Sequence, residues 1–179
     1  MKIVVLTGSP HRDGTSNVLA EAFTRGAQEA GHTVRRFDCA FLNVHACTAC
    51  DRCRSGAAQP CVFQDDMRPL YDRLVEADAV VYVTPVYYHG MTAQLKTVID
   101  RFYGINAKLC GAKKKTALLA AAASPHAWVM DGLTAWYHAD ARYLGWEDCG
   151  AVLATGCVTK QDVEKTDYPQ QAYELGRHL

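Results

Sequence analysis

Short apolar runs alternate with amphipathic segments along this chain. Four runs rich in valine, leucine and alanine span residues 2–7, 79–84, 116–123 and 150–156. Runs of this kind are typical of parallel strands that are buried on both faces of a sheet. Residues 33–38 (TVRRFD) hold more polar positions. We expect one more strand here, the second along the chain, that lies nearer an edge of the sheet.

The segments between these runs show the spacing of helices. From Thr15 to Ala30 apolar side chains recur at helical intervals, and Gly31 follows as a stop signal. The same pattern predicts further helices over residues 67–76, 91–102, 126–144 and 169–179. Asp65 and Asp66 stand where the helix over 67–76 begins, so we interpret these two carboxylates as helix caps.

The order of these elements predicts the fold. Strands that alternate with helices form a parallel sheet covered on both faces, joined by right-handed crossovers. Five such strands in 179 residues predict an α/β fold, a flavodoxin-like doubly wound five-stranded parallel sheet in the order 2-1-3-4-5. We expect residues 1–179 to form a single domain, with a cysteine-bearing loop at about 39–64. A loop of this length inside a compact domain is usually functional.

Ligands of doubly wound sheets bind beyond the carboxyl ends of the strands, where the strand order reverses. The loops that we expect to form a site are therefore residues 8–17, 85–90 and 123–128.

Composition and charge exclude several classes of protein. The chain has 19 basic and 19 acidic residues, so no net charge favours nucleic acid or an anionic membrane surface. No apolar stretch reaches the roughly 20 residues that a membrane-spanning helix needs. The first residues read as a strand and not as a signal peptide. We therefore expect a cytoplasmic protein, in which the eight cysteines serve as thiols or ligands.

The loop GSPHRDGTSN follows the first predicted strand. It lacks both G-x-G-x-x-G and G-x4-G-K-[ST], so it matches neither a Rossmann nor a Walker loop. Its hydroxyls and backbone N–H groups stand between a strand and a helix N-terminus, where they suit a phosphate. His11 or Arg12 would add a further donor. The alternative is ordinary capping of the helix by Thr15 or Ser16.

The loop PVYYHG follows the third predicted strand. Pro85 stiffens the exit from the strand, and Tyr87 and Tyr88 offer aromatic faces. An isoalloxazine ring needs apolar side chains against its face and backbone polar groups at its edge. Tyr87 and Tyr88 are suited to pack against the face of such a ring. Packing of both tyrosines under a helix is the alternative.

Four cysteines form the compact pattern C-x2-C-x2-C-x7-C, at Cys47, Cys50, Cys53 and Cys61. Four interpretations remain open. Structural zinc usually takes two separated C-x2-C pairs, and a disulfide is disfavoured in the expected compartment. A [4Fe–4S] cluster takes four thiolates, three of which a C-x2-C-x2-C triplet supplies; four free thiols are the last interpretation. The scattered residues Cys39, Cys110, Cys149 and Cys157 are interpreted as packed core thiols.

Several motifs together resemble a known family. GSPHRDGTSN, ACTACDRCRSGAAQPCVFQDDM, ADAVVYVTPVYYHGMTAQLKTVIDRF and AYELGRHL resemble the flavodoxin-like NAD(P)H-dependent FMN reductases, and more narrowly their iron–sulfur flavoprotein branch. The resemblance covers nearly the whole chain in matching order. It implies bound FMN, NAD(P)H as cosubstrate and a [4Fe–4S] cluster on Cys47, Cys50, Cys53 and Cys61. The FMN-binding residues that it implies are Ser9, His11, Arg12, Gly14, Thr15, Ser16, Asn17, Pro85, Val86, Tyr87, Tyr88 and Ser124.

We therefore expect an FMN-dependent oxidoreductase that passes electrons from NAD(P)H to a quinone, a nitro or azo compound, or a flavin. The flavin carries the chemistry, so no side chain is predicted to be a catalytic acid or base. With a cluster in the chain, electrons would also pass through or to it, and a ferredoxin-like donor would be a partner. The resemblance implies a homodimer or homotetramer.

Two other classes of protein remain as alternatives. One is a non-enzymatic flavin electron carrier, although such carriers are commonly acidic and this chain has no net charge. The other is a metal-stabilised interaction module whose loops bind no nucleotide.

Overall fold

The computed structural model describes residues 1–57 and 59–179. The strands are β1 (Lys2–Thr7), β2 (Thr33–Asp38), β3 (Ala79–Pro85), β4 (Lys115–Ala121) and β5 (Glu147–Ala154). The α-helices are α1 (Thr15–Glu29), α2 (Met67–Glu76), α3 (Ala93–Asp100), α4 (Asn106–Leu109), α5 (Asp131–Leu144), α6 (Lys160–Glu164) and α7 (Tyr168–His178). Three 3-10 segments complete the fold: η1 (Cys39–Phe41), η2 (Arg101–Ile105) and η3 (Ala127–Met130).

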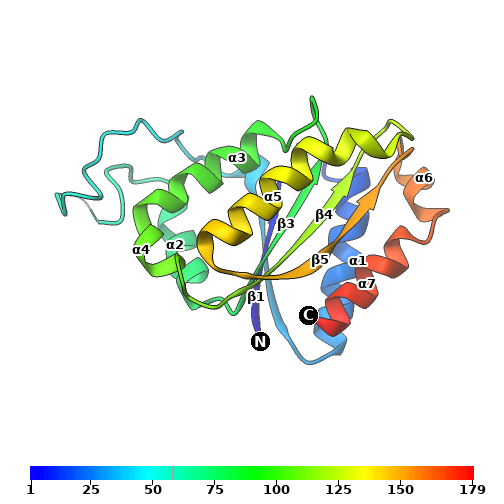
Figure 1. Cartoon of the computed structure of the whole chain (residues 1–179), viewed down its shortest axis with the longest axis horizontal. Helices are drawn as coiled ribbons and strands as arrows, with labels where there is room; N and C mark the ends of the chain where they lie inside the picture. Colours follow the sequence, from blue (N-terminus) through cyan, green and yellow to red (C-terminus); the bar gives the residue numbers. More distant parts are fainter. Residues whose placement is uncertain (58) are drawn as a thin grey trace.

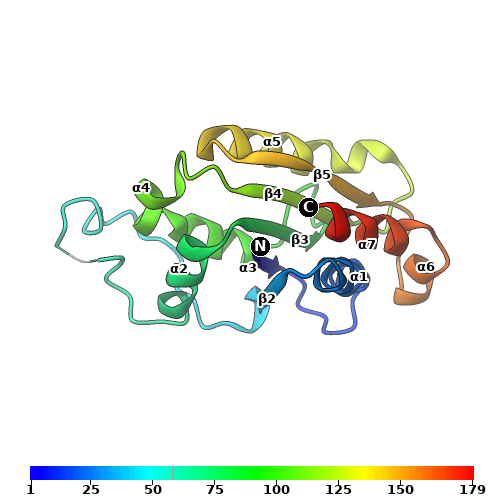
Figure 2. The same cartoon turned by 90° about the horizontal axis from the view of Figure 1, so that it is seen from below.

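The five strands form one parallel sheet in the order β2-β1-β3-β4-β5, which confirms the predicted flavodoxin-like order. Helices cover both faces of this sheet (Figures 1 and 2). Buried side chains of α2, α3, α4 and α5 pack on one face, and those of α1, α6 and α7 pack on the other. Because both faces are covered, the inner strands are apolar at successive positions.

Strand β1 shows how the alternation works. Ile3 and Val5 point to the face covered by α1 and α7, and Val4 and Leu6 point to the opposite face. All four side chains are nearly inaccessible to solvent. This two-sided burial is the reason that a continuous apolar run, and not an alternating pattern, predicts the strand.

Several boundaries differ from the predicted ones. The helix predicted over 91–102 begins at Ala93 and continues as the 3-10 segment η2 after Asp100. The helix predicted over 126–144 begins as η3, and α5 ends at Gly145, which adopts a positive φ of 68°. Strand β5 begins at Glu147, before the predicted start. The short helices α4 and α6 were not predicted.

The segment between η1 and α2 carries the four clustered cysteines. Its described residues, 42–57 and 59–66, form turns and irregular backbone, and they extend beyond the edge of the sheet (Figures 1 and 2, cyan). We call residues 42–66 the cysteine loop; Ala58 within it lies outside the described residues.

In the part of the chain that is described, no helix combines the length and the apolar character needed to cross a membrane.

Candidate functional site

A cavity of about 640 Å³ lies at the carboxyl ends of the strands. It is lined by the loops that follow β1, β3, β4 and β5, which meet at one edge because the strands are parallel. Doubly wound sheets bind their ligands at this edge. We call this space the strand-end cavity.

Eight of the twelve predicted FMN residues line the strand-end cavity: Ser9, His11, Arg12, Gly14, Thr15, Pro85, Val86 and Tyr87. The other four predicted residues, Ser16, Asn17, Tyr88 and Ser124, do not line it. The structure therefore brings the loops after β1 and β3 together around one space, as the sequence predicts.

Helix α1 points its N-terminus at the strand-end cavity. Gly14 is its N-cap, no side chain caps its backbone N–H groups, and its first turn holds no acidic residue. The alternative that Thr15 or Ser16 serves as the N-cap is therefore wrong. The hydroxyl of Ser16 is buried and has no hydrogen-bond partner. Uncapped N–H groups at the positive end of a helix dipole suit an anion such as a phosphate.

Asn17 shapes the loop from behind. Its side-chain amide donates hydrogen bonds of 2.7 Å to the carbonyl oxygens of His11 and Arg12, and its oxygen accepts one from Arg36 at 3.0 Å. Ser9 fixes the same turn, because its hydroxyl lies 3.1 Å from both the backbone nitrogen and the carbonyl oxygen of His11. Asn17 thus positions the loop, whereas the prediction had given it a direct contact with the cofactor.

Two basic side chains line the strand-end cavity. The exposed guanidinium of Arg12 lies over the Phe41 ring, 3.8 Å from its centroid. Lys160 lines the cavity from the loop after β5 and forms an i,i+4 ion pair of 3.9 Å with Glu164. Asp13 is the one carboxylate among the lining residues. This balance favours an anionic ligand.

The loop after β3 turns Tyr88 outward. Tyr88 and His89 both have positive φ values, 48° and 64°, and the backbones of Tyr87 and Gly90 exchange two hydrogen bonds across them. This is the geometry of a tight two-residue hairpin turn. Tyr88 is fully exposed as a result, so the alternative that it packs under a helix is wrong. His89 instead contacts Trp128, with ring centroids 5.0 Å apart.

The loop after β4 contributes small side chains. Ala121 and Ala123 line the strand-end cavity, whereas the Ser124 hydroxyl accepts a bond of 3.4 Å from the backbone nitrogen of His126. At this loop Ala123, and not its neighbour Ser124, lines the strand-end cavity.

The loop after β5 was missed from the sequence. Cys157, Val158, Thr159 and Lys160 line the strand-end cavity. Thr159 caps α6 in a reciprocal pair with Asp162, which fixes where this loop ends. The signal was present in the sequence. CVTK follows the apolar run 150–156, and Thr159 stands three residues before Asp162.

Helix α3 ties two of these loops together through its N-cap, Thr92. The Thr92 hydroxyl donates a hydrogen bond of 2.8 Å to the carbonyl of Gly8, and the Thr92 backbone nitrogen donates one of 3.1 Å to the Thr84 hydroxyl. Gly8 leaves no room for a side chain, because a Cβ atom there would lie 2.8 Å from that of Leu95. The loop after β1 is thus packed directly on the start of α3.

A second, smaller cavity is lined by all four clustered cysteines, Cys47, Cys50, Cys53 and Cys61. We call it the cysteine cavity. All eight cysteines of the chain are present as thiols. Among the described residues, no three His, Cys, Asp or Glu side chains are arranged to hold a single metal ion.

The scattered cysteines have other surroundings. Cys39 and Cys157 are buried, and Cys110 and Cys149 are partly buried. Burial raises the pKa of the Cys39 thiol to about 12, so this thiol is inert at neutral pH.

A buried ion pair holds the base of the cysteine loop. Arg101 donates hydrogen bonds of 2.7 and 3.2 Å to the two carboxylate oxygens of Asp65, and a third of 2.8 Å to the His45 carbonyl. Both charged side chains are 1% exposed. Burial alone would raise the pKa of Asp65, but the bonds from Arg101 and from the His45 backbone outweigh it and lower the pKa to about 2.

The interpretation of Asp65 and Asp66 as helix caps is therefore incomplete. Asp65 does accept a bond of 3.2 Å from the backbone nitrogen of Met67, but Arg101 is its main partner. Asp66 makes no side-chain cap and accepts a bond of 2.7 Å from the backbone nitrogen of Asn43. Through these bonds, both carboxylates hold the two ends of the cysteine loop together.

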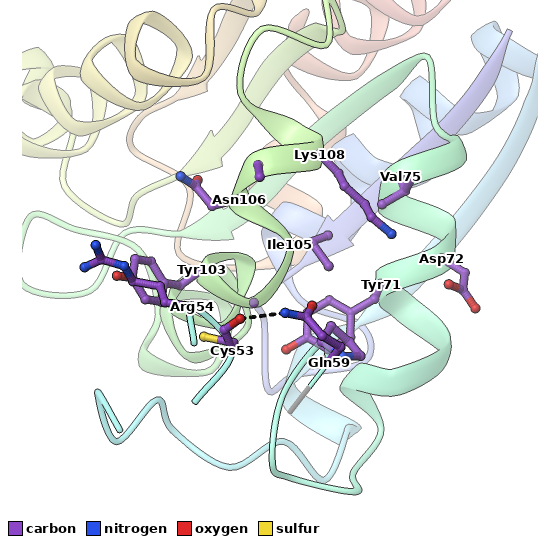
Figure 3. Close-up of a pocket in the computed structure, with 13 residues that line it drawn as sticks. Cys53, Arg54, Gln59, Tyr71, Asp72, Val75, Tyr103, Ile105, Asn106 and Lys108 are labelled. Carbon is purple, nitrogen blue, oxygen red and sulfur yellow. Dashed lines mark hydrogen bonds between the residues drawn. The ribbon is translucent and has the colours of Figure 1, made fainter. Parts of the chain in front are cut away.

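A second arginine holds the returning arm of the loop. Arg68 donates to the carbonyl oxygens of Gln59, Cys61 and Phe63 at 3.1, 2.8 and 3.3 Å. Across the loop, the Gln59 amide donates a bond of 2.6 Å to the Cys53 carbonyl (Figure 3). Side chains thus satisfy backbone groups that no helix or strand satisfies here.

A further cavity of about 670 Å³ lies between the cysteine loop, α2, η2 and α4 (Figure 3). Tyr71, Tyr103 and Arg54 are among its lining residues, and it reaches the loop at Cys53. It shares no lining residue with the strand-end cavity. The two regions of the molecule are therefore separate spaces.

A doubly wound parallel sheet with an anion-suited loop after its first strand defines a flavodoxin-like nucleotide-binding protein. The profile of the NADPH-dependent FMN reductases matches residues 1–139, and the chain belongs to this family.

Relatives in sequence carry a more specific name. The chain is 36% identical over 113 residues to an iron–sulfur flavoprotein of Archaeoglobus fulgidus, a match that covers 62% of this chain and 50% of the relative. It is 37% identical over 108 residues to one from Methanocaldococcus jannaschii, covering 60% and 54%. The chain thus matches about half the length of these curated relatives.

Solved structures share the fold. An NAD(P)H:quinone oxidoreductase from Methanothermobacter marburgensis superposes with a TM-score of 0.75 at 21% identity, covering 99% of this chain and 95% of the other. An azoreductase from Bacillus anthracis gives a TM-score of 0.77 at 18% identity, covering both chains completely. At this level of identity the likeness establishes the fold alone.

Proposed function

We propose that this protein is an FMN-dependent oxidoreductase that takes electrons from NAD(P)H and passes them to a small-molecule acceptor. The observation that carries the proposal is the strand-end cavity, where an uncapped helix N-terminus meets a partly aromatic loop. Bound FMN supplies the redox chemistry of such an enzyme. Membership of the NADPH-dependent FMN reductase family supports the same cofactor and cosubstrate.

The residues of the strand-end cavity fall into two groups under this proposal. Ser9, Thr15 and the first-turn N–H groups of α1 bind the phosphate, with Arg12 and Lys160 adding positive charge. Pro85, Val86 and Tyr87 lie against the ring, and the small side chains of the loop after β4 leave room for it. None of these residues is assigned as an acid or a base.

We further propose that Cys47, Cys50, Cys53 and Cys61 hold a [4Fe–4S] cluster. Four thiolates on one cavity are the donor set that such a cluster takes, and a cluster would carry single electrons. The names of the sequence relatives support this assignment. The acceptor would then be a quinone, a nitro or azo compound or a flavin, with a ferredoxin-like protein as an alternative electron donor.

Titration with FMN and with riboflavin tests the strand-end cavity. We expect the wild-type chain to bind FMN more tightly than riboflavin, because only FMN carries the phosphate. Lys160→Ala should weaken FMN binding by about tenfold, or ~1.4 kcal/mol, and leave riboflavin unchanged. Lys165→Ala is the matched control, because this exposed lysine does not line the cavity and should change neither affinity. No uptake of FMN by the wild-type chain would overturn the proposal.

Turnover separates an enzyme from an electron carrier. We expect the FMN-loaded chain to oxidise NADPH or NADH in the presence of a soluble quinone. Tight FMN binding without turnover of either nicotinamide would favour the electron-carrier alternative.

A further inference from the structure

The cysteine cavity has a buried positive charge on its wall. Arg101 lines this cavity together with the four cysteines, and its side chain is 1% exposed. The two carboxylates that also line the cavity, Asp51 and Asp100, are both exposed, and Asp100 is paired with Lys96. The charge that is shielded from solvent beside the four sulfur atoms is therefore positive.

The Nε–H group of this guanidinium makes no hydrogen bond. The two terminal nitrogens of Arg101 donate to Asp65 and to the His45 carbonyl, whereas Nε is buried and has no hydrogen-bond partner. Buried donors without a partner are rare and cost free energy, more so on a charged group. The neighbouring hydroxyl of Tyr71 is also buried without a hydrogen-bond partner. An acceptor supplied by a bound group would remove the cost for Nε.

The guanidinium is held in place by aromatic packing as well as by Asp65. Its carbon atom lies 5.1 Å from the centroid of the Phe63 ring, and that ring stacks on His45 with centroids 4.8 Å apart. Phe63 and Arg101 line the cysteine cavity, whereas Asp65 does not. The positive member of the ion pair is thus the one that lines the cavity together with the cysteines.

We propose that the Nε–H group of Arg101 donates a hydrogen bond to a sulfur atom of the cluster or of its cysteine ligands, and that its charge eases reduction of the cluster. This inference rests on the cluster assignment of the proposed function. Reduction adds one electron from a one-electron donor, with no bond broken and no proton moved. Hydrogen bonds to sulfur and nearby charge set the potential of such clusters. A fixed positive charge stabilises the reduced, more negative form and raises the potential.

Two variants isolate the effect of Arg101. Asp65→Asn removes the negative charge of the pair and leaves the guanidinium, so the cluster potential should stay the same or rise. Adding Arg101→Gln to Asp65→Asn removes the guanidinium without leaving a buried carboxylate unpaired. This double variant should have a lower potential than Asp65→Asn alone, by about tenfold in the reduced-to-oxidised ratio, or ~59 mV for one electron.

Two further variants serve as controls. Arg73→Gln removes an exposed arginine of α2 that pairs with Glu76 and does not line the cysteine cavity, so its potential should match the wild type. Arg101→Lys keeps the charge and loses the Nε–H group, so its potential should lie below that of the wild type.

The measurement is a redox titration of anaerobically purified full-length protein, loaded with FMN and reconstituted with ferrous iron and sulfide. Iron, sulfide and FMN per chain are counted for each variant before the midpoint potential is read from the visible and EPR spectra. Equal potentials in Asp65→Asn and the double variant would overturn the role of Arg101. If the double variant holds no cluster, an Arg101→Lys potential equal to that of Arg73→Gln would overturn it instead.

The outcomes for the wild-type chain distinguish the two proposals. A wild-type chain that binds FMN but takes up no iron and sulfide overturns the cluster assignment, and the role of Arg101 with it. A wild-type chain that holds a cluster whose potential does not depend on Arg101 overturns the role of Arg101 alone.

Discussion

The strand-end cavity and the cysteine loop are held in place by different means. The loops around the strand-end cavity are short, and each is anchored between a strand and a helix of the doubly wound sheet. No helix or strand supports the described residues of the cysteine loop. Arg68 and Arg101 bind its carbonyl groups instead. A site built on regular elements tolerates the loss of single side chains, whereas a site built on two arginines depends on each of them.

The largest effect is expected from Arg101→Ala. The change leaves the buried carboxylate of Asp65 without its partner, which should lower the free energy of unfolding by about 3–5 kcal/mol. Urea denaturation measures this loss, and Arg73→Ala is the control, since its ion pair with Glu76 is exposed and worth under about 1 kcal/mol. A loss as small as that of the control would show that the cysteine loop is not held in this way.

Two glycines allow each region to be disturbed separately. A Cβ atom at Gly104 would lie 2.5 Å from the Pro60 carbonyl oxygen, and one at Gly8 would collide with the start of α3. Each change to alanine should cost about 1–3 kcal/mol. Gly104→Ala should reduce iron uptake and spare FMN binding, and Gly8→Ala should do the reverse.

Gly90→Ala is the control for both glycine variants, because its new Cβ atom would come no closer than 4.0 Å to the backbone of Tyr87. FMN titration measures binding at the strand-end cavity, and iron analysis measures uptake by the cysteine loop. Loss of both FMN binding and iron uptake in either glycine variant would mean that the two regions do not respond independently.

Acid should release the cysteine loop before it affects the strand-end cavity. Because the folded pKa of Asp65 is about 2 and its ordinary value is 3.8, its ionised form stabilises the folded state. This contribution, about 2 kcal/mol, is complete above pH 4 and is lost as the pH falls toward 2. Urea midpoints at pH 7 and pH 3 measure it, and Asp65→Asn should flatten the dependence. An equal pH dependence in wild type and variant would contradict the assignment.

The smallest effect is expected in the loop after β5. Thr159→Ala removes the hydroxyl of the capping box that begins α6, at a cost of about 1 kcal/mol. The change should also weaken FMN binding slightly, because Thr159 lines the strand-end cavity. Thr97→Ala is the control, since that hydroxyl bonds only to a carbonyl of its own helix. Equal FMN affinities in the two variants would remove Thr159 from the site.

The sequence predicts the sheet well because the information is local. A strand such as β3 is buried on both faces, so its apolar run is continuous and easily recognised. Strand β5 begins where Glu147 and Asp148 interrupt that pattern, and its early start was missed. Asp148 is accommodated there by a bond of 2.6 Å from the Tyr137 hydroxyl, a contact that no local pattern reveals.

In the candidate site, too, local sequence patterns predict some features, and only the folded chain reveals the others. The loop after β1 was predicted because its polar residues stand between two recognisable elements, although which of its side chains face the cavity depends on the turn. The outward position of Tyr88 follows from two positive φ values that tyrosine and histidine rarely adopt, so the sequence did not predict it. Arg101 and Asp65 are 36 residues apart, and only the folded chain shows that they meet.

Helix α3 sets the separation between the two regions. Its N-cap, Thr92, is bonded to Gly8 and Thr84 beside the strand-end cavity, and Arg101, directly after its last residue, holds the cysteine loop. A helix of eight residues is about 12 Å long and does not stretch. Within one chain, α3 therefore acts as a spacer of fixed length. Its length fixes the distance between the N-cap beside the strand-end cavity and the arginine that holds the cysteine loop.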